Sequence, residues 1–155
     1  METPDRTIII LRGIPGAGKS TYAKKLVDDG WNRVNKDEIR HMINGYKMNN
    51  ADEKIVEMIQ DMALIGLMNE GRNIVVDNTH SKQKYIDNIM GHVKVFNQET
   101  ELKRFPEPEF KYTVRIETID TPLEECIRRN ALRERPVPEE VLRTMHKNLF
   151  PEMYK

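Results

Sequence analysis

Cysteine is almost absent from this sequence, and its scarcity excludes two kinds of protein. The 155 residues contain a single cysteine, Cys126, so the chain can form neither an intrachain disulfide nor a cysteine-based metal cage. A reduced, cytoplasmic setting fits this composition best. Long hydrophobic runs are also lacking, since the start of the chain has only residues 8–11 as a continuous apolar stretch. We therefore expect no signal peptide and no membrane span.

An excess of positive charge is missing as well. Lys plus Arg and Asp plus Glu number 25 each, so the formal net charge is zero. A protein that binds nucleic acid through its whole surface usually carries a basic excess, so any such contact here must come from a few clustered Arg or Lys side chains. A chain of 155 residues suits one hydrophobic core, and we expect a single domain spanning 1–155.

Short β-rich runs alternate with helical stretches along the chain. Such alternation predicts an α/β fold, a three-layer sandwich with a mainly parallel central sheet and helices on both faces. Residues 97–111 are polar and interrupted by prolines, which predicts a loop. The expected strands span 7–11, 33–35, 73–76 and 112–119, and the expected helices span 17–27, 36–43, 52–69, 82–90, 123–132 and 139–149.

A glycine-rich segment follows the first expected strand and matches the pattern G-x-x-x-x-G-K-[ST] at every fixed position. Its backbone can wrap closely around a polyphosphate, because glycines leave no side chain in the way. Lys19 would reach the β- and γ-phosphates, and the Ser20 hydroxyl would bind Mg²⁺. The motif therefore predicts a P-loop NTPase-type fold that uses ATP and Mg²⁺. The expected phosphate-binding residues are Gly13, Pro15, Gly16, Ala17, Gly18, Lys19, Ser20 and Thr21.

The other motifs distinguish between kinds of P-loop protein. GTPases need a guanine-reading N-K-x-D element far along the chain, and Asn35-Lys36-Asp37-Glu38 misplaces the acid and comes too early. Motor and AAA ATPases need a longer chain and usually an arginine finger from another subunit. A small kinase needs a carboxylate base, a second acid near Mg²⁺ and mobile arginines over the phosphates. This sequence has candidates for all three.

Two acids are candidates for those roles. Asp37 opens a helix just past a strand, where its carboxylate could project into the phosphate cleft. Alternatively, Asn35 caps the helix, Glu38 completes a capping box and Asp37 merely faces the helix dipole. Arg40 shares the helical face of Asp37 and could hold an acceptor phosphate or form an ion pair. Asp77 follows the third expected strand at its carboxyl end, where ligands gather in open α/β sheets. It is therefore a candidate Mg²⁺ ligand, and the alternative is a solvated strand-end side chain.

Several arginines lie on the expected helix 123–132 and just after its end. Arg129 and Arg133 are spaced i, i+4 and share a face, as a lid that closes over the transferred phosphoryl group requires. Arg128 lies beside them in sequence. A solvated basic face is the alternative explanation of such a cluster. We expect the helical arginine lid over about 127–138.

Four segments, spread from near the start of the chain to near its end, carry a resemblance that extends over nearly the whole chain. They are G-I-P-G-A-G-K-S-T (13–21), V-N-K-D-E-I-R (34–40), V-V-D-N-T-H (75–80) and I-R-R-N-A-L-R-E-R-P-V-P-E-E-V-L-R-T-M (127–145). They resemble the kinase domain of the 5′-OH polynucleotide kinase family, especially the phage T4 type. The first segment is common to many kinases, whereas the N-[RK]-D-x-x-R block and the R-N-x-x-R…V-P…M pattern are more specific together.

The resemblance implies a role for several residues. Asp37 falls on the general base that takes the proton from a 5′-hydroxyl, and Arg40 falls on the residue that binds the 3′-phosphate of the acceptor. Arg129 and Arg133 fall on lid arginines that contact the donor phosphates. Because the chain stops at Lys155 with no phosphatase or ligase domain, we expect a stand-alone kinase.

One motif departs from the family. After the middle strand the family commonly reads D-x-T-N, and His80 stands where Asn is usual. The acceptor contacts expected in this loop come from Asn78, Thr79 and His80.

The sequence thus predicts a kinase that transfers the γ-phosphate of ATP to a hydroxyl on nucleic acid, with a 5′-OH end of DNA or RNA as the leading acceptor. A hydroxymethylated base in DNA or a small-molecule hydroxyl is the alternative acceptor. A different class of protein, an ATP-binding regulatory module without phosphotransfer, is also open. The expected catalytic residues are Lys19, Asp37, Arg129 and Arg133, and the expected Mg²⁺ ligands are Ser20 and Asp77.

Overall fold

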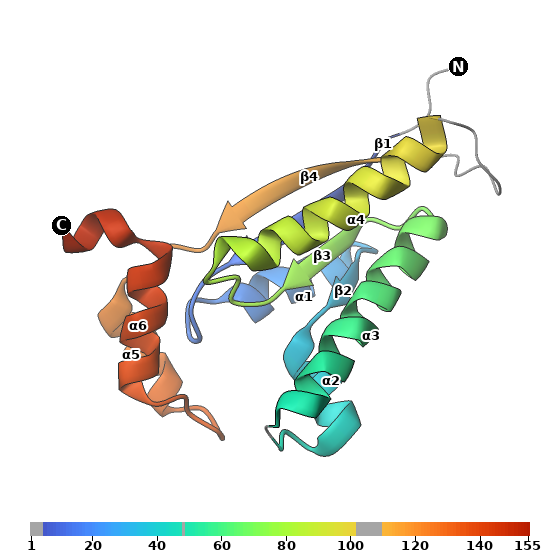
Figure 1. The fold of residues 1–155 in the computed structure, drawn as a ribbon. Coiled ribbons are helices and arrows are strands. Elements are labelled where there is room, and N and C mark those ends of the chain that lie inside the picture. The colour runs from blue at the N-terminus through green and yellow to red at the C-terminus, as the bar shows by residue number, and fades with distance from the viewer. Residues whose placement is uncertain (1–4, 48, 102–109) are drawn as a thin grey trace.

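The computed structural model describes residues 5–47, 49–101 and 110–155 (Figure 1). None of the described helices combines the length and the hydrophobicity that a membrane crossing requires. In chain order the elements are β1 (Asp5–Arg12), α1 (Lys19–Asp28), β2 (Asn32–Val34), α2 (Lys36–Asn44), α3 (Asn50–Asn69), β3 (Ile74–Asp77), α4 (Gln83–Glu101), β4 (Lys111–Thr118), α5 (Leu123–Ala131), α6 (Glu139–Leu149) and a short 3₁₀ helix (Pro151–Tyr154).

The four strands form a parallel sheet in the order β2-β3-β1-β4. Parallel strands end at the same edge of a sheet, and in open α/β folds ligands bind beyond that edge. Leu11 of β1 pairs with Asp77 of β3. The phosphate loop, which follows β1, therefore begins beside Asp77.

Consecutive residues of β1 face opposite sides of the sheet, and all four from Ile8 to Leu11 are fully buried. Ile8 and Ile10 pack in one cluster with side chains of α3 and α4, whereas Ile9 and Leu11 pack in another with Ala23 of α1. Each buried side chain of this size stabilises the fold by about 1.5–3 kcal/mol. The expected three-layer sandwich with a parallel central sheet is confirmed.

Helices α5 and α6 lie beside the sheet rather than on either face (Figure 1). A third apolar cluster joins them to the phosphate loop, with Ile14 and Ala17 from the loop, Cys126 from α5 and Leu142 from α6. Burial raises the pKa of the Cys126 thiol. This cysteine therefore serves packing, and the α5–α6 unit is attached to the very loop that it would cover.

Helix α4 is longer than the sequence pattern predicted. The expected helix 82–90 continues to Glu101, because Val93 and Phe96 extend the buried stripe that Ile86 and Ile89 begin, at spacings typical of a helix. The predicted loop 97–111 is thus wrong at 97–101, and its remaining part to 109 lies outside the described residues.

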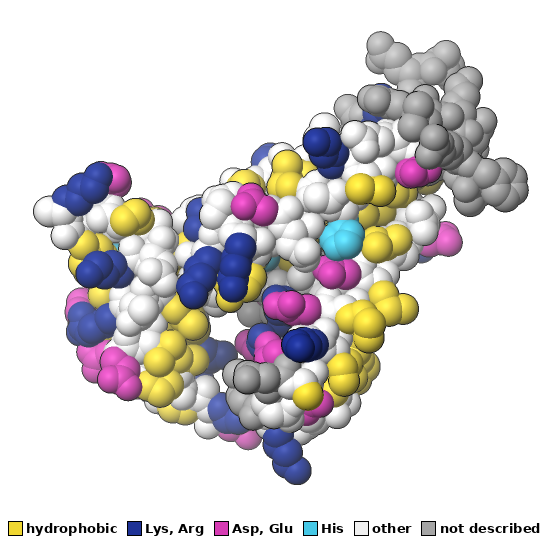
Figure 2. Space-filling model, in the orientation of Figure 1, with side chains coloured by type: hydrophobic (Ala, Val, Ile, Leu, Met, Phe, Trp, Pro, Cys, Tyr) yellow, Lys and Arg dark blue, Asp and Glu magenta, His cyan; other side chains and the backbone are white. Residues whose placement is uncertain are grey.

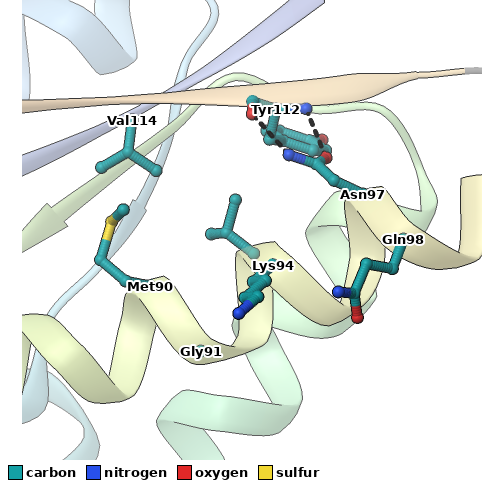
Figure 3. A pocket seen from close by; sticks show the side chains of 8 residues that line it. Met90, Gly91, Lys94, Asn97, Gln98, Tyr112 and Val114 are labelled. Atoms are coloured by element: carbon teal, nitrogen blue, oxygen red, sulfur yellow. Dashed lines mark hydrogen bonds between the residues drawn. The ribbon is translucent and has the colours of Figure 1, made fainter. Parts of the chain in front are cut away.

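A groove of about 560 Å³ runs between α4 and β4 (Figure 3). At one end of it the side-chain amide of Asn97 donates to the Tyr112 carbonyl and accepts from the Tyr112 N–H, both at 2.9 Å. The groove is lined by Tyr112 and Val114 from the first half of β4. It is therefore separate from the phosphate loop, which lies at the other end of the strands.

Candidate functional site

The phosphate loop delivers the N-terminus of α1 to the carboxyl edge of the sheet. Gly18, in the left-handed conformation (φ 105°), is the N-cap of α1; no side chain of the described residues caps the helix, and its first turn carries no acid. The N–H groups of the first turn and the helix dipole are therefore available to an anion. This is the backbone arrangement that a phosphate group needs.

Helix α5 presses directly on the loop. Gly16 has a φ of +85°, and a Cβ at this position would lie 2.5 Å from the carbonyl oxygen of Cys126. Thr121 adds a hydrogen bond from its hydroxyl to the Ala17 carbonyl at 2.7 Å. A larger residue than glycine at position 16 would therefore force α5 and the loop apart.

Lys19 lies among the charged groups of the cleft. Its ammonium group donates to the Ile14 carbonyl at 3.2 Å. Burial lowers the pKa of Lys19 from 10.5 to about 8, while the charges of Asp77 and Asp37 oppose this shift and the charge of Arg133 adds to it. The predicted base, the predicted metal-side acid and one lid arginine are thus all close enough to act on the phosphate-loop lysine. A bound phosphate would favour the charged form of Lys19.

Asp77 is almost fully buried (1% exposed) and has a partner that the sequence did not reveal. Arg33 donates to Asp77 Oδ2 through Nε at 2.9 Å and Nη2 at 2.6 Å. Ser20 Oγ lies 3.5 Å from the same oxygen. The pair forms because β2 and β3 run side by side, with Arg33 paired to Val75. The only sequence signal for it is a charged residue inside a short strand.

The two predicted metal ligands, Ser20 and Asp77, are a hydroxyl and a carboxylate close together, which are oxygen ligands that Mg²⁺ prefers. Within the described residues, no group of three or more His, Cys, Asp or Glu could hold a metal alone. Mg²⁺ usually completes its shell with water and substrate phosphates, so the side chains fit. A Mg²⁺ ion at Asp77 would compete with the Arg33 guanidinium for the same oxygen.

Asp37 lies in the first turn of α2 with its side chain 62% exposed. Asn35 caps this helix by accepting from the Glu38 N–H at 2.9 Å, as the alternative reading of the sequence expected. The Glu38 carboxylate does not complete a capping box among the described residues but lies 3.9 Å from Arg33. Capping is thus the task of Asn35, and the role of Asp37 as a base stays a prediction.

Arg40 is already engaged by two carboxylates. It donates to Asp37 Oδ1 at 2.7 Å through Nη1, and its Nε and Nη2 bind the two oxygens of Glu53 at 2.6 and 3.0 Å. The hydrogen bonds to Glu53 are the main reason why the pKa of Arg40 is raised. A guanidinium that binds a carboxylate in this two-pronged way can bind a phosphate in the same way.

The lid arginines differ in what they contact. Arg129 donates to the Gly16 carbonyl at 3.3 Å through Nη1 and to Glu125 through Nε at 2.9 Å. Arg128 binds Glu125 with both Nε and Nη2, and together the two arginines hold the pKa of Glu125 at about 2. The backbone N–H of Arg133 donates to the Asn130 carbonyl at 3.1 Å, but its side chain has no hydrogen bond or ion pair with the other described residues. Within this cluster Arg129 contacts the phosphate loop directly, whereas Arg133 acts on Lys19 only through its charge.

The loop after β3 joins several elements. Asn78 donates to Gln60 at 2.7 Å and accepts from the Lys36 N–H at 2.8 Å, and the Thr79 carbonyl accepts from the N–H of Gly13. His80 is 3% exposed, and burial lowers its pKa to about 4. These contacts hold the loop in place, and the acceptor role of Asn78, Thr79 and His80 stays a prediction.

The α5–α6 pair and the α2–α3 pair face each other (Figure 1). Figure 2 shows a hollow between the α5–α6 pair and the α2–α3 pair, with basic and acidic side chains around it. The charges of Asp37, Asp77 and Arg133 each act on Lys19, and Arg129 contacts the loop directly. The arrangement brings the phosphate loop, carboxylates and arginines together around one hollow.

A protein-family model described as "AAA domain" matches residues 8–151. The chain belongs to this family.

Solved structures share the fold. A chain of the Pnkp1/Rnl/Hen1 RNA repair complex aligns with a TM-score of 0.78 and 22% identity, over 99% of this chain and 47% of that one. The APS kinase CysC of Mycobacterium tuberculosis aligns with a TM-score of 0.56 and 19% identity, over 83% and 70% of the two chains. A gluconokinase from Sinorhizobium meliloti 1021 aligns with a TM-score of 0.52 and 15% identity, over 96% and 77%.

These likenesses show a P-loop kinase fold, and together with the family match they confirm the resemblance to polynucleotide kinases that the motifs indicated. The chain spans about half the length (47%) of the chain from the RNA repair complex that it matches.

Proposed function

We propose that the chain is a kinase that transfers the γ-phosphate of ATP, with Mg²⁺, to a 5′-hydroxyl end of DNA or RNA. One observation carries the proposal: the start of α2, which bears Asp37, is tied to the end of β3 and its following loop by hydrogen bonds from Asn35 and Lys36. Arg129 of α5 contacts the phosphate loop from the other side. A phosphate site, a carboxylate base and a lid cation around one space are the parts that phosphoryl transfer requires.

Each residue has one task in this reaction. The N–H groups of the loop and Lys19 bind the phosphates of ATP, and Arg129 and Arg133 approach them from the lid. Asp37 accepts the proton of the acceptor hydroxyl. The oxygen of that hydroxyl forms a bond to the γ-phosphorus, while the bond between the γ-phosphorus and the oxygen bridging it to the β-phosphate breaks. ADP is the leaving group. Bound Mg²⁺, near Ser20 and Asp77, would neutralise phosphate charge.

Arg40 supports a nucleic acid as the acceptor. It lies one helical turn from Asp37 and already binds carboxylates on two sides, so an acceptor whose phosphate follows its 5′-hydroxyl has an anion-binding side chain beside the proposed base. The similarity to a chain of an RNA repair complex supports the same class of acceptor. To act as a base, Asp37 must exchange its contact with Arg40 for the acceptor hydroxyl.

A small-molecule hydroxyl is the second candidate, because a gluconokinase and an APS kinase have the same fold. A hydroxymethylated base in DNA would need the same base and the same donor site. A regulatory module that binds ATP without transfer would have no use for Asp37 at the cleft.

The test supplies the protein with γ-labelled ATP, Mg²⁺ and a panel of acceptors. The panel holds 5′-OH RNA and DNA oligonucleotides, the same oligonucleotides with 5′-phosphates, duplex DNA with a hydroxymethylated base, nucleosides and gluconate. We expect label on the 5′-OH oligonucleotides and none on their 5′-phosphorylated counterparts. Label on the modified base or on a small molecule alone contradicts the proposed acceptor, and tight ATP binding without any transfer contradicts phosphotransfer itself.

A further inference from the structure

The turn after α2 carries an aromatic pair that the proposed reaction does not use. Gly45 and Tyr46 are both in the left-handed conformation, with φ of 60° and 73°. The Tyr46 ring stacks on the His41 ring, with centroids 4.8 Å apart and planes inclined by 19°. This conformation is uncommon for a residue with a large side chain, and such strain is often found where a side chain has a functional task.

A flat cation covers the Tyr46 ring. The guanidinium carbon of Arg135 lies 3.0 Å from the ring centroid. Arg135 belongs to the segment between α5 and α6, so this contact joins the lid to the α2–α3 side of the hollow (Figures 1 and 2). Aromatic rings stack nucleobases and guanidinium groups in the same way, because both ligands are planar and delocalised. The ring of Tyr46 is thus a stacking surface at the edge of the cleft.

The position of this surface suits an acceptor strand. Helix α2 carries Asp37 in its first turn and Arg40 one turn later, and it ends at Asn44. At about 1.5 Å per residue the helix spans about 10 Å from Asp37 to its end. A strand whose 5′-hydroxyl lies at Asp37 and whose first phosphate lies at Arg40 therefore runs toward Tyr46.

We propose that Tyr46, stacked on His41, binds a base of the acceptor strand by stacking, and that Arg135 covers the ring when no acceptor is present. This inference rests on the proposed function and makes its substrate class narrower. A base beyond the first nucleotide has both faces covered by its neighbours in a duplex, so it can stack on the Tyr46 ring only when the strand is unpaired there. The acceptor is therefore a single-stranded end longer than one nucleotide.

The test measures kcat and KM for 5′-OH acceptors of increasing length, from a nucleoside 3′-phosphate to a decanucleotide, and for decanucleotides with one abasic position each. Three variants are compared with the wild type. Tyr46→Gly removes the ring and suits the left-handed backbone, Tyr46→Phe keeps the ring, and Arg135→Ala removes the covering cation but leaves the surface. The KM for ATP and the melting temperature report on the fold of each variant.

Stacking of one base predicts a KM for long acceptors that is about 5- to 150-fold higher in Tyr46→Gly, with an unchanged KM for the nucleoside 3′-phosphate and for ATP. Tyr46→Phe and Arg135→Ala keep the dependence on length. One abasic position raises the KM of the wild type and has no effect on Tyr46→Gly, and this position identifies the stacked base.

Other results overturn the inference in ways that can be told apart. If Tyr46→Gly and Arg135→Ala have the same defect with all acceptors and with ATP, the contact only holds the lid in place. If no abasic position distinguishes the wild type from Tyr46→Gly, the ring binds no base, although the proposed function stands. If the wild type labels no nucleic acid at all, the proposed function fails and the stacking site fails with it.

Discussion

The proposed ATP-binding side of the cleft (the donor side: the phosphate loop with α5 and α6) and the proposed acceptor-binding side (α2 and α3) are built in different ways. On the donor side, Ile14 and Ala17 of the phosphate loop are buried in a cluster with α5 and α6, and Gly16 lies against the backbone of Cys126. On the acceptor side, α2 has no buried residue. The side chains to which we assign a role on this helix are held by ion pairs, such as Arg40 with Asp37.

The difference has a physical consequence. Packed backbone keeps its shape before ATP arrives, because a change would expose apolar surface. Partly exposed ion pairs contribute at most about 1 kcal/mol each, so an acceptor phosphate or hydroxyl can replace them. The donor side is therefore preorganised and the acceptor side is exchangeable. This fits the finding that the same fold occurs in a gluconokinase and an APS kinase.

The strongest test of a preorganised donor side is Lys19→Met. We expect kcat to fall by about 1,000-fold or more, because the cation on the transferred phosphate is lost.

The same variant should be more stable than the wild type at pH 7, by up to about 3 kcal/mol. The pKa of Lys19 is lowered to about 8 in the folded chain from 10.5, so between these pH values the unfolded chain binds more protons. Wild-type stability therefore rises with pH through this window, and the difference from Lys19→Met shrinks toward pH 10.5. Urea unfolding at pH 7 and pH 10 measures it, and a variant that is less stable at both pH values contradicts the burial of this charge.

The lid offers a matched pair of arginines. Arg129→Ala should lower kcat by about 100-fold, because only Arg129 reaches the Gly16 carbonyl. Arg128→Ala removes a similar contact with Glu125 and should stay within about 3-fold of the wild type in kcat. Steady-state kinetics with ATP measure both variants. Equal losses would mean that the lid acts through its overall positive charge rather than through one placed side chain.

On the acceptor side, Arg40→Ala should raise the KM of an acceptor with a 3′-phosphate by about 10-fold or more, since a charge-assisted hydrogen bond is lost. The KM for ATP and for an acceptor without that phosphate should not change. Arg143→Ala is the control, because it breaks an exposed ion pair with Glu139 on α6. A higher KM for ATP in Arg40→Ala would mean that Arg40 also affects ATP binding, which contradicts separate donor and acceptor sides.

Arg33 lies where the two sides meet, and its substitution should have the smallest effect on nucleotide binding and turnover. In Arg33→Gln the buried carboxylate of Asp77 loses its cation, so the melting temperature should fall and Mg²⁺ without nucleotide should restore more of it than in the wild type. The Mg²⁺ concentration needed for half-maximal ATP binding should fall about 3-fold. Thermal unfolding and ATP titrations at several Mg²⁺ concentrations measure this. An unchanged Mg²⁺ dependence would mean that Arg33 and Mg²⁺ do not compete for Asp77.

The donor side could be predicted from the sequence because its signal is local. The glycines, Lys19 and Ser20 stand within one short segment, and an apolar strand before it fixes their context. The pair of Arg33 and Asp77 depends on the register of β2 with β3, which no local pattern specifies. The contact of Arg135 with Tyr46 joins segments far apart in the chain.

The end of α4 is a different case. Val93 and Phe96 continued an apolar stripe that was visible in the sequence, but the polar residues after them and the later prolines favoured a loop. Packing against the sheet decided the helix, because Phe96 and Tyr112 meet edge to face at 5.3 Å.

The most direct test of the account is the single-turnover rate of Asp37→Asn. The ATP complex is formed first and then mixed with excess 5′-OH oligonucleotide, so that neither binding step limits the rate. We predict a rate at least about 100-fold below the wild type with unchanged ATP affinity, and a rate within about 3-fold for the neighbouring control Glu38→Gln. An Asp37→Asn rate within a few fold of the wild type would contradict Asp37 as the base and, with it, the proposed acceptor site.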